Sequence, residues 1–425
     1  MVPRSPARSA GTVTAARTFP TRRCGRGGRT GRTGCDVARV LVIGGGIAGT
    51  AAAVALRKAG IDVVVYEAHP DSAEDIGAFL TLASNGMRAL AQLDASAAVT
   101  AVGFPLTSMR VLDGAGTAVA HVPLGEAADP LLRYRCLRRG ELNRALQAEA
   151  SRRGVDIRHG ARLTSVQDGP GGVTAHFADG STETGDVLVG ADGLNSTVRR
   201  AVEPATRPRH AGQRVFYGYT GATALPGPDA CITMVRGGPG GFGCAVSPDG
   251  ESYWFARVPG DPLPLDEIAR GTPAGWRDLL VPSLRADAPV AAEVVAATTD
   301  DIMVTNATEL PPGAPWRTAR TLLIGDAAHA ASPATGQGAS MALEDAVVLA
   351  KSLRDAPDTE TALSHYESLR RPRTEHNTTV SGNISRGTHT RPVGGAPPSR
   401  PGDDDLARLL DWDLDIMTVR PVHQG

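Results

Sequence analysis

The chain has 425 residues and a formal net charge of −1, so it is long enough for one large domain or two medium-sized ones with real cores. Hydrophobic residues make up 41% of it and charged residues 21%, as in globular proteins. No apolar run of about 18 residues lacks a charge, so no membrane span is expected. Residues 1–36 carry +7, which leaves −8 for the rest. This acidic body gives no reason to expect nucleic acid or an anionic membrane as a partner.

Residues 1–36 are rich in Arg, Gly and Thr and are expected to form a disordered basic leader, because such a composition cannot bury a core. No apolar stretch follows the twin arginine Arg22-Arg23, so a signal peptide is not predicted. A disordered tail and an extension upstream of the natural start are the favoured interpretations. The cysteines are odd in number and lack metal-ligand spacing, which indicates a reduced, cytoplasmic chain with no metal site. They are Cys24, Cys35, Cys136, Cys231 and Cys244.

The pattern strand, glycine turn, helix, strand extends over residues 39–66 and predicts a βαβ unit. Residues 39–43 and 61–66 are continuous apolar runs, of the kind that a parallel sheet buries on both faces. Residues 50–59 are rich in alanine and end at Gly60, which is typical of a helix and its C-terminal stop.

The turn of this unit reads GGGIAG over residues 44–49. Gly44 suits the tight turn, Gly46 admits a pyrophosphate, and Gly49 lets the helix pack closely on the strand. The phosphates would then lie at the helix N-terminus. Glu67 lies eighteen residues after Gly49, at the end of the next strand, where an acid can bind a ribose hydroxyl. The motif and its context predict a dinucleotide site.

Helices and strands alternate up to residue 204. The predicted helices are 85–93 and 139–152, and the predicted strands are 108–112, 118–122, 156–159, 173–177 and 186–189. Residues 205–300 contain alternating runs separated by Gly/Pro turns, which favours an antiparallel sheet. A second GxGxxG pattern at residues 238–243 has no helix after it, so we interpret it as a turn. A strand at 321–324 and long helices at 339–354 and 360–385 follow.

Two further motifs follow buried strands. Residues 190–199 read GADGLNSTVR, which suits either a polar pocket around Asp192 or ordinary helix capping by Asp192 or Ser196. Residues 325–346 read GDAAHAASPATGQGASMALEDA. Here an acid, Asp326, precedes a Pro/Gly loop and a helix start, an arrangement that can accept from a sugar-like hydroxyl and approach a flat ring. Asp326 could also cap local backbone donors, and we interpret His329 as structural.

Together, the three motifs resemble the single-component FAD-dependent aromatic hydroxylases, the p-hydroxybenzoate hydroxylase-like monooxygenases. The resemblance covers most of residues 38–385 and includes the order of the motifs. It implies an α/β fold in which a Rossmann-like FAD-binding domain with a parallel sheet carries an antiparallel substrate-binding sheet. Many relatives have Arg directly after the acid at the second strand, whereas this chain has Ala68. That difference affects a nicotinamide or flavin phosphate contact and not the fold.

By resemblance, Glu67 holds the adenosine ribose, Asp326 the ribityl hydroxyls, Asp192 the flavin and the nicotinamide, and Arg139 contacts the flavin. The proline and glycines of the third motif line the isoalloxazine, and Thr81 approaches the ring. The implied cofactor-binding residues are Gly44, Gly46, Ala48, Gly49, Glu67, Thr81, Arg139, Asp192, Asp326, Pro333, Gly336 and Gly338. No catalytic acid or base is assigned.

The implied FAD-binding domain is discontinuous and consists of residues 37–105, 125–204 and 300–390. The antiparallel domain consists of residues 106–124 and 205–299, and residues 391–425 form a C-terminal tail.

The resemblance further implies that NAD(P)H reduces FAD and that oxygen then forms a flavin C4a-hydroperoxide. This would insert one oxygen atom into an aromatic or polyketide-like small molecule. Helix dipole and N–H groups starting near Gly338 would stabilise the reduced flavin. A monomer or a homodimer is expected. Two alternatives stay open: a flavin-dependent reductase of the same fold, and a non-catalytic flavin protein that sequesters a small molecule. A flavin halogenase is disfavoured, because residues 253–259 read YWFARVP and not the halogenase pattern.

Overall fold

The computed structural model describes residues 37, 39–72, 78–222, 225, 228–237, 240–388 and 403–420. The predicted basic leader lies outside the described residues, as do Cys24 and Cys35 and most of the predicted loop at 391–404.

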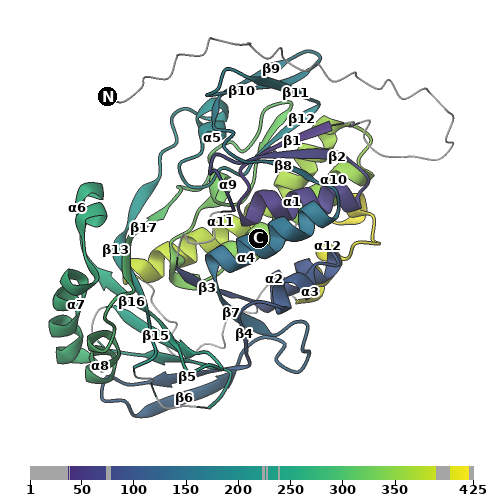
Figure 1. The fold of residues 1–425 in the computed structure, drawn as a ribbon. Helices are drawn as coiled ribbons and strands as arrows, with labels where there is room; N and C mark the ends of the chain where they lie inside the picture. Colours follow the sequence, from purple (N-terminus) through teal and green to yellow (C-terminus); the bar gives the residue numbers. More distant parts are fainter. Residues whose placement is uncertain are drawn as a thin grey trace, which may run out of the picture. The chain divides into compact units, whose positions relative to one another are not determined.

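Five strands form a wholly parallel sheet (Figure 1). Across the sheet they are β18 (Thr321–Leu323), β12 (Val187–Gly190), β1 (Arg39–Ile43), β2 (Asp62–Tyr66) and β8 (Asp156–Arg158). The central strand β1 pairs Ile43 with Gly190 and with Tyr66, so the carboxyl ends of three strands meet. The strands come from early, middle and late parts of the sequence.

Helix α1 (Ile47–Lys58) packs against α4 (Arg139–Arg152) and α10 (Gly338–Asp355), and α10 also packs against α2 (Ser84–Gln92) and α11 (Thr359–Ser385). Residues 51–56 of α1 and 340–353 of α10 are buried all round, as expected of central helices. The short helices of this part are α3 (Ser96–Thr100), α5 (Thr197–Val202) and α9 (Asp326–His329).

A seven-stranded sheet forms the second part of the fold. Its order is β17 (Ile302–Glu309), β13 (Arg209–Thr220), β16 (Ser252–Pro259), β15 (Gly241–Val246), β14 (Cys231–Val235), β5 (Ser108–Leu112) and β6 (Ala118–Pro123). The hairpin predicted at 108–122 is present as β5 and β6. All pairs are antiparallel except β14 with β5, which is parallel.

The two faces of this sheet bury different residues. Phe216 of β13 and Trp254 of β16 lie in a core with Trp276 of α7 (Pro273–Asp287), and the Trp254 ring nitrogen donates to the Thr298 hydroxyl at 2.9 Å. Tyr217 and Tyr219 lie on the other face, as strand alternation requires. Figure 1 shows α7 and the neighbouring helices along one side of the sheet.

Two small antiparallel sheets complete the fold. One has the order β3 (Phe79–Leu82), β7 (Tyr134–Arg138), β4 (Phe104–Leu106), and the other β11 (Thr182–Gly185), β10 (Gly172–Phe177), β9 (Leu163–Gly169). Phe79 of β3 makes edge contacts with Tyr217, Tyr219 and Tyr253. The tyrosine face of the large sheet therefore faces β3, which leads into α2.

The structure differs from the sequence prediction in three places. Strand β17 pairs with β13, whereas the sequence assigned 300–390 to the FAD-binding part. Residues 265–296 contain the helices α6 (Leu265–Arg270), α7 and α8 (Pro289–Ala296), which the antiparallel interpretation missed. The predicted C-terminal tail contains α12 (Asp403–Leu410) and the 3₁₀ turn η2 (Ile416–Thr418).

The C-terminal segment packs on the core and is hydrogen-bonded to α10. Leu410 and Ile416 are fully buried, and the buried Lys351 ammonium of α10 donates to the carbonyls of Leu409 and Asp411. Within the described residues, no helix has the length and apolar character to cross a membrane. Cys136, Cys231 and Cys244 are free and buried.

Candidate active site

The three motifs meet at the carboxyl ends of β1, β12 and β18. Gly44 has φ +106°, and a Cβ on it would lie 2.4 Å from the carbonyl oxygen of Ala191. A Cβ on Gly49 would lie 1.9 Å from the Gly44 carbonyl oxygen. A Cβ on Gly325 would lie 2.7 Å from the Ala48 Cβ. Only glycine permits backbones to approach this closely, so these contacts bring all three motifs together.

The starts of α1 and α10 have room for a ligand. Within the described residues, neither N-cap residue, Gly46 of α1 or Gln337 of α10, makes a side-chain capping bond, so the first N–H groups are not satisfied within the helix. A Cβ on Gly46 or Gly338 would meet nothing within 4 Å. Uncapped helix starts beside open space suit an anionic ligand, because both the N–H groups and the helix dipole favour negative charge.

Glu67 lies beside the first motif. Its carboxylate accepts from the backbone N–H of Gly45 at 2.5 Å and from that of His69 at 2.7 Å. The Gln147 amide donates to the Gly45 carbonyl at 2.7 Å. These bonds fix the acid at the end of β2, where its remaining lone pairs can accept from a hydroxyl.

Asp192 lies before the N-terminus of helix α5, whose N-cap residue is Ser196. Its carboxylate accepts from the N–H groups of Thr197 at 2.7 Å and Val198 at 3.1 Å, and from the Ser196 hydroxyl. Burial raises the pKa of Asp192, although these three donors oppose the shift. The cap is therefore real, and contact of Asp192 with flavin or nicotinamide stays a prediction. The Arg199 guanidinium donates to the Ala327 carbonyl at 3.1 Å, which ties this motif to the third.

Asp326 is the first residue of α9, and its side chain is exposed. No hydrogen bond of its carboxylate to another described residue is present, so it does not act as a cap within that part of the chain. Pro333 begins the 3₁₀ turn η1 (Pro333–Thr335), and Gly336 follows with φ +66°. A Cβ on Gly336 would lie 3.3 Å from the Thr81 hydroxyl. The structure thus brings Thr81 beside the third motif.

Arg139 is the first residue of α4, and its side chain is exposed. Its positive charge reaches Tyr217 and opposes the effect of burial, which raises the pKa of that tyrosine to about 12. Tyr217 is therefore a neutral phenol at ordinary pH. Arg139 directly follows β7, and its charge acts on the tyrosine face through Tyr217.

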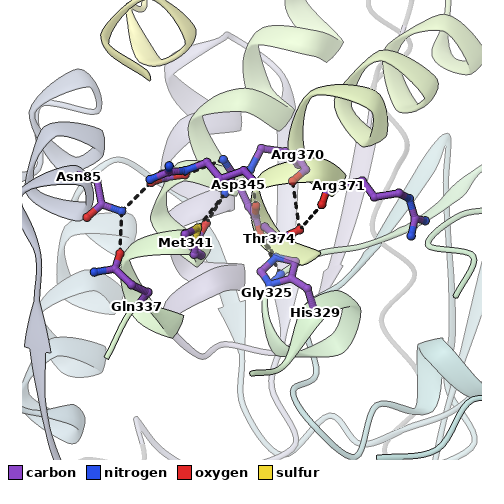
Figure 2. Close-up of polar contacts among 11 residues, drawn as sticks. Asn85, Gly325, His329, Gln337, Met341, Asp345, Arg370, Arg371 and Thr374 are labelled. Carbon is purple, nitrogen blue, oxygen red and sulfur yellow. Dashed lines mark hydrogen bonds and ion pairs between the residues drawn. The ribbon is translucent and has the colours of Figure 1, made fainter. Parts of the chain in front are cut away.

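A network of buried ion pairs is hydrogen-bonded to the third motif. It was not predicted from the sequence. The fully buried Arg370 of α11 donates to Glu344 at 2.6 Å and to Asp345 at 2.8 Å. Asp345 in turn accepts from the Gly325 N–H at 2.9 Å and lies 2.6 Å from the His329 ring nitrogen. Figure 2 shows Arg370, Asp345, Gly325 and His329 in this cluster. The signal was present: two acids lie side by side in the apolar run of α10.

The negative charges of Glu344 and Asp345 are compensated by the cations around them. Burial alone would raise the pKa of Asp345, but His329 and Arg370 outweigh it and hold that pKa well below its usual range. Burial likewise opposes ionisation of Glu344, whereas Arg370 and Arg373 lower its pKa. Both acids are therefore ionised in the folded protein. His329 belongs to this network, in agreement with its structural interpretation.

Comparison with known proteins identifies the family. A family model described as "FAD binding domain" matches residues 37–381. Aurachin C monooxygenase/isomerase of Stigmatella aurantiaca is 32% identical over 341 residues, 78% of this chain and 84% of that protein. The 3-amino-4-hydroxybenzoate 2-monooxygenase PtnB3 of Streptomyces platensis is 35% identical over 355 residues, 79% of this chain and 84% of that protein. This chain belongs to the FAD-dependent aromatic monooxygenases.

A solved structure of this family has a fold similar to that of this monooxygenase. Klebsiella pneumoniae HpxO complexed with FAD and uric acid matches with a TM-score of 0.74 and 28% identity, over 84% of this chain and 90% of that one. The predicted α/β fold class, the enzymatic activity and the FAD cofactor are thereby confirmed, and NAD(P)H is the typical electron donor of the family. The monooxygenase acts on a small molecule.

The network generates a stability prediction for Arg370→Met. The substitution leaves two buried carboxylates without their shared partner, which typically costs about 3–5 kcal/mol. In the native protein both acids have lowered pKa values. Their ionisation therefore contributes to the free energy of unfolding above their pKa values in the unfolded chain, about 4, and this contribution is lost at lower pH. Without Arg370 their pKa values rise, so the destabilisation should be largest at pH 7 and smaller at pH 5. Urea unfolding at both pH values measures this.

Arg371→Met is the matched control, because Arg371 is the next residue and pairs with Glu367 and Glu375 near the surface. Its cost should be smaller and nearly independent of pH in this range. Equal costs for the two variants, or an R370M cost that grows toward pH 5, would contradict the assignment of Arg370 as the partner of ionised acids.

Proposed function

We propose that this monooxygenase uses the edge formed by its three motifs to hold FAD and the tyrosine face to hold an aromatic substrate. The convergence of Gly44, Asp192 and Gly325 at one sheet edge is the observation that carries the proposal. The residues present fit the cofactor: two uncapped helix starts suit its negative parts, and acids at the strand ends suit its hydroxyls.

The proposed roles follow from position. The glycines at 44, 46 and 49, with Ala48, bind the pyrophosphate, and Glu67 binds the adenosine ribose. Asp326 accepts from the ribityl chain, and Arg139 contacts the flavin. Asp192 lies beside the flavin and the nicotinamide. Thr81, Pro333, Gly336 and Gly338 would hold the flavin ring. When bound, FAD supplies electron transfer from NAD(P)H and the activation of oxygen.

The proposed substrate pocket lies on the tyrosine face. Phe79, Tyr217, Tyr219, Tyr253 and Phe255 pack together there with centroid distances of 4.9–6.3 Å. Such a face excludes water and suits a planar ring. The phenol of Tyr217 can donate a hydrogen bond to a ring oxygen, because burial keeps it neutral.

Arg257 of β16 is the proposed anchor for a negative group of the substrate. Its guanidinium donates to the Ala334 carbonyl in η1 at 3.3 Å, so it lies beside the third motif. Its Nε is buried without a hydrogen-bond partner, and no acid pairs with it within the described residues. Burial lowers the pKa of Arg257, with Tyr217 opposing. A desolvated, unpaired guanidinium favours an oxyanion.

The relatives support an aromatic substrate with oxygen substituents. One acts on 3-amino-4-hydroxybenzoate by its name, and one solved neighbour holds uric acid. An aromatic ring that carries a carboxylate fits Arg257 best. We place the enzyme in the cytoplasm, as a monomer or a homodimer.

The oxygen-insertion step is tested with ¹⁸O₂. Purified protein should be yellow, should oxidise NAD(P)H faster when a substrate is added, and should give a product that carries one ¹⁸O atom, measured by mass spectrometry. Substrate-stimulated NAD(P)H oxidation with an unlabelled product would identify a reductase of the same fold. A protein that binds FAD and ligand but consumes no NAD(P)H would identify a sequestering protein.

Asp326→Ala should weaken FAD binding by about 10- to 100-fold, because a charged group contributes roughly 1.5–3 kcal/mol per hydrogen bond. The dissociation constant of FAD is measured by fluorescence quenching. The stability of the FAD-free protein should not change, since the Asp326 carboxylate is exposed. Asp278→Ala, which removes an exposed acid on α7, is the matched control. Unchanged FAD affinity in D326A would remove Asp326 from the site.

Arg257→Gln tests the substrate anchor with paired hydroxybenzoates and hydroxybenzamides. The native enzyme should favour the acids, and R257Q should raise KM for the acids by about 10- to 100-fold while KM for the amides changes little. Arg214→Gln on β13 is the control, because Arg214 donates to the Asp261 carbonyl near the surface. An amide preference in the native enzyme, or an acid preference retained in R257Q, would refute the anchor.

A further inference from the structure

We infer that Asn85 is a positioning residue that fixes the start of α10 against the flavin and thereby helps to set how strongly the site favours reduced over oxidised FAD. The inference rests on the proposed function, in which the first turn of α10 faces the flavin ring. Asn85 belongs to α2 and lies outside the three motifs.

Asn85 joins two acceptors on α10. Its side-chain amide donates to the Gln337 side-chain oxygen at 3.1 Å and to a Glu344 carboxylate oxygen at 2.6 Å (Figure 2). Because an ionised carboxylate only accepts, the NH₂ end of Asn85 must point at Glu344, and this choice fixes the orientation of the amide. Gln337 is the residue that immediately precedes α10. Asn85 therefore connects the loop before the helix to the helix interior.

Glu344 provides a rigid base for this connection. It is fully buried, and its two oxygens also accept from Arg370 at 2.6 Å and from Arg373 at 2.9 Å. A carboxylate held by two guanidinium groups has little freedom to move. The position of Asn85, and through it that of Gln337, is thus set by the buried network.

The close packing of α2 on α10 limits movement further. The Ala83 N–H donates to the Ser340 hydroxyl at 3.1 Å, and a Cβ on Gly86 would lie 2.8 Å from the same hydroxyl. Asn85 therefore lies between two residues whose backbones are in contact with the first turn of α10. The helix start is held from α2 by a hydrogen-bonded amide on one side and by direct packing on the other.

This restraint bears on redox chemistry through the free N–H groups of the first turn. Those groups and the helix dipole act on negative charge only near the helix end and in a suitable direction. Reduction of the flavin adds negative charge to the ring, and preorganised donors stabilise such charge without rearrangement. If Gln337 loses its hydrogen bond to Asn85, the N–H groups of the first turn should stabilise the flavin less. The loss should be larger for the reduced form than for the oxidised form.

The experiment measures the two-electron reduction potential of bound FAD and the dissociation constant of oxidised FAD for the native protein, Asn85→Ala, Gln337→Ala and the double variant. Each single variant should reduce the preference for reduced over oxidised FAD by five- to tenfold, a fall of about 20–30 mV for a two-electron couple. The double variant should fall by no more than the larger single change, because both substitutions break one connection.

Arg88→Ala is the matched control, because Arg88 is on the same helix and its ion pair is with Glu126, outside α10. Its potential should equal that of the native protein. A flavin-loaded N85A or Q337A with an unchanged potential, or with only a lower melting temperature, would overturn the inference. If N85A does not fold, Q337A decides alone. Native protein that binds no FAD would instead refute the proposed function.

Discussion

The pairing of Arg370 with Glu344 and Asp345 is the interaction on which the candidate site depends. All three side chains have no exposed surface, so the two acids are tolerated in the middle of α10 only because a cation from α11 compensates them. Their other oxygens extend the network outward, through Gly325 to the third motif and through Asn85 to the start of α10. This buried ion network therefore fixes both the third motif and the start of α10 in the proposed flavin site.

Close backbone approach is the second constraint. The parallel sheet brings the ends of β1, β12 and β18 to one edge, but only residues without a Cβ allow the loops that follow to touch. Gly44 against Ala191 and Gly325 against Ala48 are the two contacts that require this. The glycines are thus needed for the assembly of the motifs as well as for space around a phosphate.

Much of this architecture could be predicted from sequence, because it depends on local patterns. The βαβ unit at 39–66, helix α4 and the hairpin β5–β6 were predicted nearly to the residue, since apolar runs and glycine turns are local signals. Helices α6–α8 were missed because Gly and Pro around them resemble the turns of a sheet. Helix α12 was missed because its contacts are with distant parts of the chain, such as Lys351, which lies 58 residues before Leu409.

The site shows the same division between local and long-range information. The motif residues could be named from sequence, since each lies in a recognisable short pattern. Arg257 and Asn85 could not be named from sequence, because the roles proposed for them depend on contacts that are visible only in the folded chain. Arg257 is notable for an unpaired buried nitrogen, and Asn85 for two acceptors some 250 residues away. The residues proposed to hold the cofactor thus lie in or near short motifs, whereas the proposed substrate anchor and the proposed positioning residue are recognised only from contacts in the folded chain.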